Sequence, residues 1–206
     1  MKTVQVRNIT LGEGRPKICV PIVGQTKDDI LLEAGTFARI PVDVVEWRVD
    51  WFEDVFDTDK VLDVAKDLQT ILKDTPILFT FRTSKEGGEK AISNEAYKAL
   101  NMAVAKSGYV DLIDVEAFTG EEIVKSMIRE AHSYGVKVIA SNHDFDATPE
   151  KDEIVRRLRM MQDYGADIPK MAVMPRNKQD VLTLLSATLE MSEQFADRPI
   201  ITMSMA

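Results

Sequence analysis

The stretch Val44-Val45-Glu46-Trp47-Arg48-Val49-Asp50 (VVEWRVD, residues 44–50) has two faces of different chemistry. Successive side chains of an extended strand point to opposite sides, so Glu46, Arg48 and Asp50 share one face, and Val45, Trp47 and Val49 share the other. Charges that point inward are costly unless they meet one another or a polar ligand. The stretch therefore predicts a strand that turns its charged side toward a polar site.

Apolar runs of this strand type recur along the chain, and segments of helical period separate them. The seven runs are residues 18–23, 42–49, 77–81, 112–118, 136–141, 168–174 and 200–205. Strict alternation of this kind predicts an α/β fold with parallel strands and right-handed crossovers. Either an open doubly wound sheet or a closed (β/α)8 barrel fits the spacing.

Two of the helices have signals of their own. One is expected to follow Thr148 as N-cap, with Pro149 at the first helical position. Another is expected over residues 178–195. Its predicted inner stripe consists of Val181, Leu184, Leu185, Thr188 and Leu189.

The N-terminal segment predicts a short β-hairpin, from residues 3–9 and the turn Gly12-Glu13-Gly14. In a barrel such a hairpin would plug one end. No linker, low-complexity segment or shift in composition interrupts the 206 residues. We therefore expect residues 1–206 to form a single domain.

Composition excludes several classes of function. A net charge of −8 and a pI near 4.9 argue against general binding to nucleic acid or anionic membranes, which reward clustered Lys and Arg. No signal region or run of 18 apolar residues is present, so a cytoplasmic protein is expected. With two His and one Cys, a metal site is poorly supplied. Cys19, in a β-branched run, is expected to fill the core.

Lys170 lies in the apolar run 166–175, where a charge has no obvious structural purpose. An ammonium in a buried strand loses hydration, so its pKa should fall and free amine should be present near neutral pH. A free amine is what an imine-forming lysine needs. The alternative, a lysine at the mouth of a strand with its head in water, stays open.

Other polar residues fall at or near the ends of the predicted strands: Arg82, Asp114, Glu116 and His143. In a barrel they would converge with Lys170 at the C-terminal mouth, where barrel enzymes place their sites. A lattice of internal ion pairs is the alternative, above all for Asp114 and Glu116.

Two segments offer acid–base groups for such a site. In Lys85-Glu86-Gly87-Gly88-Glu89 the paired glycines permit unusual backbone angles and could present Glu86 to the mouth. His143 has an ordinary pKa near 6.5, which suits proton transfer in both directions. His132, in a helical stretch, is expected at the surface. Met203 and Met205 would share a face near the mouth.

The combination of motifs resembles the type I 3-dehydroquinate dehydratases, shikimate-pathway enzymes of the (β/α)8 class that work through a lysine Schiff base. The matching segments, in order along the chain, are residues 46–50, 79–82, 86–89, 141–145, 168–170 and 199–205. The resemblance implies that Lys170 forms the imine, that His143 is the general acid and base, and that Glu86 supports His143. Five further residues are implied to hold the substrate, three at its ring hydroxyls and two at its carbon face: Glu46, Arg48, Arg82, Met203 and Met205.

The resemblance also implies an anionic small-molecule substrate, 3-dehydroquinate, a homodimer, and no metal or organic cofactor. Members of the family normally continue for about one more strand and helix beyond the point that corresponds to Ala206, so the eighth strand and final helix are expected to be lacking here. Two alternatives stay open. One is another Schiff-base barrel lyase of the class I aldolase kind, and the other is a fragment without turnover.

Overall fold

The structure, a computed structural model, describes residues 3–205, and all seven predicted parallel strands are confirmed in it. These seven are β3 (Cys19–Ile22), β4 (Val44–Arg48), β5 (Ile77–Thr80), β6 (Leu112–Glu116), β7 (Lys137–Asp144), β8 (Ile168–Val173) and β9 (Ile201–Ser204). Two further strands, β1 (Val4–Val6) and β2 (Ile9–Leu11), precede them. The α-helices are α1 (Lys27–Phe37), α2 (Thr58–Leu72), α3 (Asn94–Ser107), α4 (Glu121–Ser133), α5 (Lys151–Asp163) and α6 (Lys178–Glu190). Two short 3-10 helices, η1 (Val49–Trp51) and η2 (Ser84–Glu86), and a π-helix, η3 (Met191–Phe195), complete the fold.

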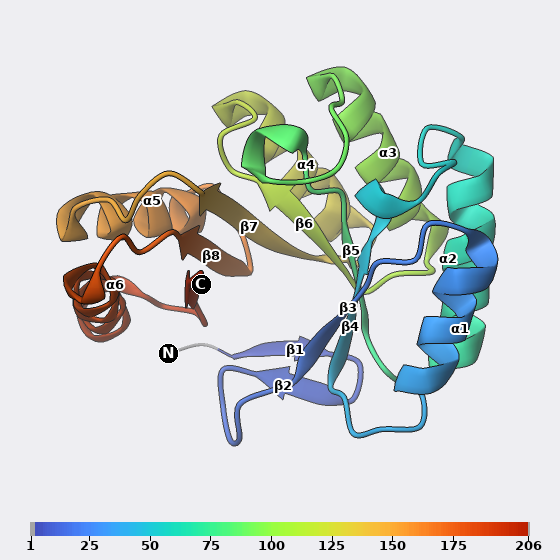
Figure 1. Ribbon diagram of the computed structural model, residues 1–206, viewed down its shortest axis with the longest axis horizontal. Helices are drawn as coiled ribbons and strands as arrows, with labels where there is room; N and C mark the ends of the chain where they lie inside the picture. Colours follow the sequence, from blue (N-terminus) through green and yellow to red (C-terminus); the bar gives the residue numbers. More distant parts are fainter. Residues whose placement is uncertain (1–2, 206) are drawn as a thin grey trace.

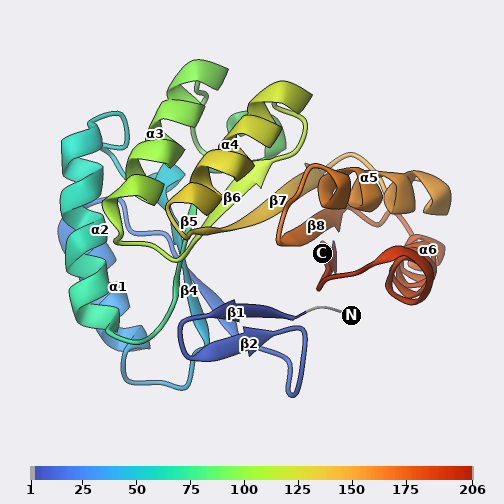
Figure 2. The ribbon, with the colours of Figure 1, turned by 180° about the vertical axis from the view of Figure 1, so that it is seen from behind.

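Strands β3 to β9 form one parallel sheet in which each strand lies beside its neighbours in the sequence. A doubly wound sheet reverses its strand order at a switch point, and this sheet does not, so that alternative is wrong. The sheet curls, and the helices follow its outer side in chain order (Figures 1 and 2). Among residues 3–205, β3 and β9 each pair with one strand, and the sheet is a half-barrel of seven strands.

The predicted hairpin is confirmed as β1 and β2, which pair antiparallel. Val4 and Val6 are buried against apolar residues near the starts of the parallel strands: Val44, Leu78, Leu112, Ile139 and Ile168. The hairpin therefore closes the N-terminal end of the half-barrel. Its turn was predicted wrongly: the chain reverses after β1 at Arg7, whose φ is +47°, and the glycines at 12 and 14 follow β2 instead.

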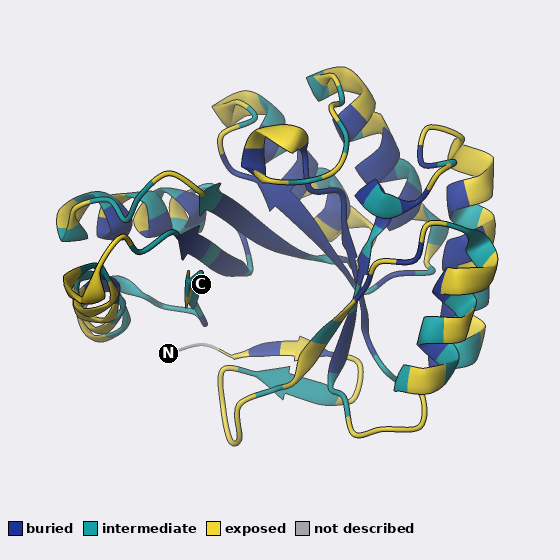
Figure 3. Cartoon of the chain, viewed as in Figure 1, coloured by how far each residue is buried: buried dark blue, intermediate teal, exposed yellow. Residues whose placement is uncertain are grey.

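The main core lies between the outer face of the strands and the helices. Trp47 and Phe79 on neighbouring strands pack edge to face, with ring centroids 5.6 Å apart. Figure 3 shows the central strands buried and the outer faces of the helices exposed. No helix within residues 3–205 is long and apolar enough to cross a membrane. Because the apolar face of β4 packs outward, its charged residues point into the half-barrel.

Two helix predictions need correction. Helix α5 begins at Lys151, after Glu150. The Thr148 hydroxyl does not cap it, because this hydroxyl donates instead to the carbonyl oxygen of Met174, just after β8, at 3.1 Å. In α6 only Leu184 of the predicted stripe is buried. Three other members of that stripe are exposed: Val181, Leu185 and Leu189. The strip of α6 that faces α5 and β8 consists of Leu184 and Ala187.

Candidate active site

The inner face of the half-barrel changes from apolar to polar along the strands. Inner positions recur at every second residue of a strand. The first inner residues, next to the hairpin, are apolar, and the inner residues that follow them are polar. They are Glu46, Arg48, Thr80, Arg82, Asp114, Glu116, Ser141, His143 and Lys170. A cavity of about 600 Å³ in this lumen is lined by Lys17, Cys19, Glu46, Lys170 and Met203 together with apolar residues. The fold thus brings residues from distant parts of the sequence to one mouth.

Lys170 lies in the middle of β8, beside Ser141 of β7 and Ile201 of β9. Its side chain is half-buried. No hydrogen bond or ion pair joins its amine to another residue within 3–205. Its charge acts on Asp114 and His143, which places both within electrostatic range. An amine without such a partner can reach a molecule in the cavity, and in its unprotonated form it is a nucleophile.

His143, near the end of β7, is held by the carboxylate of Glu86. Its ring Nδ1 lies 3.0 Å from Glu86 Oε2, and its backbone N–H donates to the same oxygen at 2.9 Å. Burial, followed by the charges of Arg82 and Lys170, lowers the pKa of His143 from 6.5 to about 3. The imidazole is therefore neutral at pH 7, and a neutral imidazole with Nδ1 protonated offers Nε2 as a base.

The glycines after Glu86 are required by the backbone, as predicted. Gly87 has a φ of +84°, in the left-handed region that favours glycine. A Cβ on Gly88 would lie 1.9 Å from the carbonyl oxygen of Arg82. Burial raises the pKa of Glu86, while Arg82 and the N–H donors around the carboxylate oppose that rise. The turn thus carries Glu86 back over the ends of the strands.

Arg82 is buried in an ion network. Its guanidinium lies 2.9 Å from Asp114 and donates to Glu116 and to the Ser141 hydroxyl, both at 3.0 Å. Burial alone would lower the pKa of Arg82, but Asp114 and then Glu116 raise it, so the guanidinium stays charged. The internal lattice considered for Asp114 and Glu116 is therefore present, and Arg82 is its centre.

Arg82→Met is expected to destabilise the protein by about 3–5 kcal/mol, because two carboxylates would be left buried without their cation. The free energy of unfolding in urea measures this loss. Arg156→Met is the control, since Arg156 pairs with Glu153 on the exposed face of α5 and such pairs are worth roughly 0–1 kcal/mol. Equal losses in the two variants would contradict the network.

The remaining charged residues of β4 and of η1, which follows it, also have partners at the mouth. Arg48 donates twice to Asp50, at 2.8 Å each. The Asp50 carboxylate is fully buried and also accepts the backbone N–H groups of Arg82 and Glu89. Glu46 accepts from the Thr80 hydroxyl at 2.8 Å. Asp50 therefore ties the loop that carries Glu86 to β4, a role that strand alternation alone did not reveal.

Some predicted positions differ from expectation. Cys19, expected in the core, is exposed and lines the lumen cavity, because the first strand turns it inward. Met203 lines that cavity, whereas Met205 is not among its lining residues. His132 lies at the surface as predicted and pairs with Asp167 at 2.7 Å.

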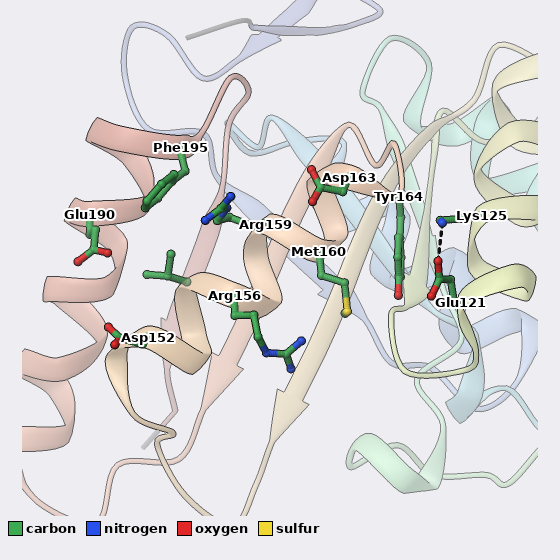
Figure 4. A pocket seen from close by; sticks show the side chains of 11 residues that line it. Glu121, Lys125, Asp152, Arg156, Arg159, Met160, Asp163, Tyr164, Glu190 and Phe195 are labelled. Atoms are coloured by element: carbon green, nitrogen blue, oxygen red, sulfur yellow. Dashed lines mark hydrogen bonds and ion pairs between the residues drawn. The ribbon is translucent and has the colours of Figure 1, made fainter.

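A larger hollow, of about 780 Å³, lies on the outer surface over α4, α5 and η3 (Figure 4). Its charges are of both signs, and Lys125 pairs with Glu121 across 2.5 Å. Arg159 stacks over the Phe195 ring at 4.4 Å from its centroid. None of the predicted site residues lines this hollow. The lumen is therefore the candidate site.

Comparison with known proteins agrees with this geometry. A family model described as Type I 3-dehydroquinase matches residues 18–206. A curated 3-dehydroquinate dehydratase of Clostridioides difficile (strain 630) is 55% identical over 205 residues, which cover 100% of this chain and 80% of that protein. A curated 3-dehydroquinate dehydratase of Salmonella agona (strain SL483) is 55% identical over 206 residues, which cover 100% of this chain and 82% of that protein.

Solved structures give the same result. A crystal structure of type I 3-dehydroquinate dehydratase from Clostridium difficile with covalent modified comenic acid has a TM-score of 0.98 and 55% identity, covering 100% of this chain and 81% of that one. The crystal structure of 3-dehydroquinate dehydratase from Geobacillus kaustophilus HTA426 has a TM-score of 0.96 and 39% identity, and the match covers 100% of this chain and 79% of that one. With a matching family model and relatives of this identity, the chain belongs to the type I 3-dehydroquinase family.

Proposed function

We propose that this protein is a 3-dehydroquinate dehydratase, a carbon–oxygen lyase that eliminates water from 3-dehydroquinate to give 3-dehydroshikimate. One observation carries the proposal most directly: an unpaired lysine amine in the lumen lies within electrostatic range of a neutral histidine that a buried carboxylate holds. The same proposal assigns the half-barrel to the (β/α)8 class, which its sequential strand order supports.

The chemistry starts with the amine of Lys170. It adds to the C3 ketone of the substrate, and loss of water gives a cationic imine that acidifies the neighbouring C2 hydrogen. Nε2 of His143 takes that proton, and the electron pair is held as an enamine. The enamine expels the C1 hydroxyl, which His143 protonates on the same side. Hydrolysis of the imine releases the product and the lysine, so the reaction requires neither a metal nor an organic cofactor.

The other site residues bind and orient. Glu86 holds the ring of His143, and Met203 and Met205 are assigned to the carbon face of the substrate. Three charged side chains are assigned to the ring hydroxyls: Glu46, Arg48 and Arg82. Because the protein carries a net charge of −8, its arginines and Lys170 must create a local positive pocket for an anionic substrate. The homodimer remains a prediction that sedimentation would test.

The test of the proposal is conversion of 3-dehydroquinate, followed by the absorbance of the conjugated enone product. We expect this absorbance to grow in proportion to the amount of protein. No product at any protein concentration would contradict the proposed activity.

Arg48→Ala is expected to raise KM about 10- to 150-fold with a smaller change in kcat, because charge-assisted hydrogen bonds are worth roughly 1.5–3 kcal/mol. Steady-state kinetics with 3-dehydroquinate measures both constants. Arg39→Ala, at an exposed residue just after α1, is the control and should leave KM unchanged. A fall in kcat with an unchanged KM would show that Arg48 acts in bond breaking instead.

A further inference from the structure

Asn142 lies on β7 between two inward-facing residues, so its side chain points to the outer side of the half-barrel. It is buried there. Its Nδ2 donates to Oε1 of Glu86 at 3.2 Å, and its Oδ1 accepts from the guanidinium of Arg157 at 2.9 Å. Asn142 thus connects helix α5, outside the half-barrel, to the carboxylate that holds His143.

The orientation of the Asn142 amide follows from chemistry. A guanidinium can only donate hydrogen bonds, so the amide oxygen must face Arg157 and the amide nitrogen must face Glu86. Arg157 is itself held in place. Its Nε donates to Glu153 at 2.7 Å, and its guanidinium lies over the Phe118 ring, 5.4 Å from the centroid. The amide is therefore fixed from its outer side.

Both oxygens of Glu86 accept N–H groups: Oε1 from Asn142, and Oε2 from the backbone and the ring of His143. A carboxylate surrounded by donors is stabilised in its ionised form, which can only accept. The proton of the imidazole must then lie on Nδ1, and Nε2 keeps its lone pair. Without the amide donor on Oε1 the ionised carboxylate would be less stable, and a carboxyl protonated on Oε2 could donate to Nδ1 and leave the imidazole proton on Nε2.

We propose that Arg157 and Asn142 are positioning residues that fix His143 as the Nδ1–H tautomer, by orienting the amide that donates to Glu86. The inference deepens the proposed function, since it rests on His143 as the base of that reaction. It adds two residues outside the lumen to those that determine turnover.

The test uses Arg157→Met and Asn142→Leu. In the ¹⁵N-labelled protein without substrate, the ring nitrogen shifts of His143 report its tautomer, and the only other histidine, His132, is assigned with His132→Gln. We expect the Nδ1–H form in the unsubstituted protein and a population of the Nε2–H form in both variants. Turnover of 3-dehydroquinate should fall about 10- to 100-fold in kcat, the size of loss that follows when the outer hydrogen-bond partners of metal-bound histidines are removed.

Arg156→Met is the matched control, because Arg156 is the adjacent residue on α5 and binds the same Glu153 but does not reach Asn142. It should keep the tautomer and kcat. Arg157 is only partly buried on its helix, so Arg157→Met tests the proposal even if Asn142→Leu does not fold.

An unchanged tautomer in Arg157→Met, or the same change in Arg156→Met, would overturn the inference. The spectra need no turnover, so they separate the two proposals. The expected shifts in a protein without dehydration activity would reject the proposed function and retain the positioning role.

Discussion

Borohydride added with 3-dehydroquinate is expected to trap one covalent adduct, on Lys170, and Lys170→Ala should form none. The amine of Lys170 is unpaired and lines the lumen cavity, and the reduction converts its imine into a stable secondary amine. Intact-mass spectrometry detects the adduct, and peptide mapping locates it. The same variant should show no turnover above the uncatalysed rate, because no imine can form to acidify the substrate.

Lys85→Ala is the control that tests position rather than residue type. Lys85 lies close to the site, where it lines two hollows beside His143, but it is exposed on the turn after β5 rather than inside the lumen. This variant should keep the adduct. An adduct that persists on another lysine in Lys170→Ala would refute the assignment of the nucleophile.

The alternation of strands and helices was sufficient to predict the order of elements, because each buried strand needs an apolar run and each covering helix needs an apolar face. It could not predict where some elements end. Thr148 has the chemistry of an N-cap, yet its hydroxyl ties the loop before α5 to the residue after β8. Such a choice between local and distant partners depends on tertiary contacts.

The face of α6 shows the same limit of local pattern. Leu185 and Leu189 belong to an apolar stripe by spacing, but among residues 3–205 they are exposed, and Leu184 makes the buried contact with α5 and β8. Periodicity predicts that a helix has an apolar face. Which part of that face is covered depends on its neighbours.

The site was predictable where strand alternation and parallel strand ends decide the geometry. Lys170, Glu46 and Met203 line one cavity because each occupies an inner position of its strand. Asn142 was missed for the complementary reason. It occupies an outer position, and its contact with Glu86 arises because the glycine turn carries that carboxylate across the strand ends.

The position of Arg82 was predictable, but its partners were not. A charged residue at an inner position can pair with a ligand or with other charged side chains, and the sequence does not distinguish the two. In the structure Asp114 and Glu116 take up its guanidinium. Its assignment to a substrate hydroxyl therefore requires that a bound ligand share this network.

His143→Ala is expected to lower turnover of 3-dehydroquinate by about 10²- to 10⁴-fold, the usual range for loss of a positioned acid and base. Burial, followed by the charges of Arg82 and Lys170, lowers the pKa of His143 to about 3, so the ring is neutral at pH 7, and Glu86 holds it through Nδ1 with Nε2 left to accept the C2 proton. Single-turnover kinetics measures the loss. Imine formation should persist, so borohydride should still label Lys170 in this variant.

His132→Ala is the matched control, since His132 is the other histidine of the chain and pairs with Asp167 at the surface. It should keep both turnover and the borohydride adduct. Near-normal turnover in His143→Ala would show that another group moves the proton. Loss of the adduct together with turnover would mean that His143 also takes part in forming the imine, so the two measurements separate its role in proton transfer from a role in the attack by Lys170.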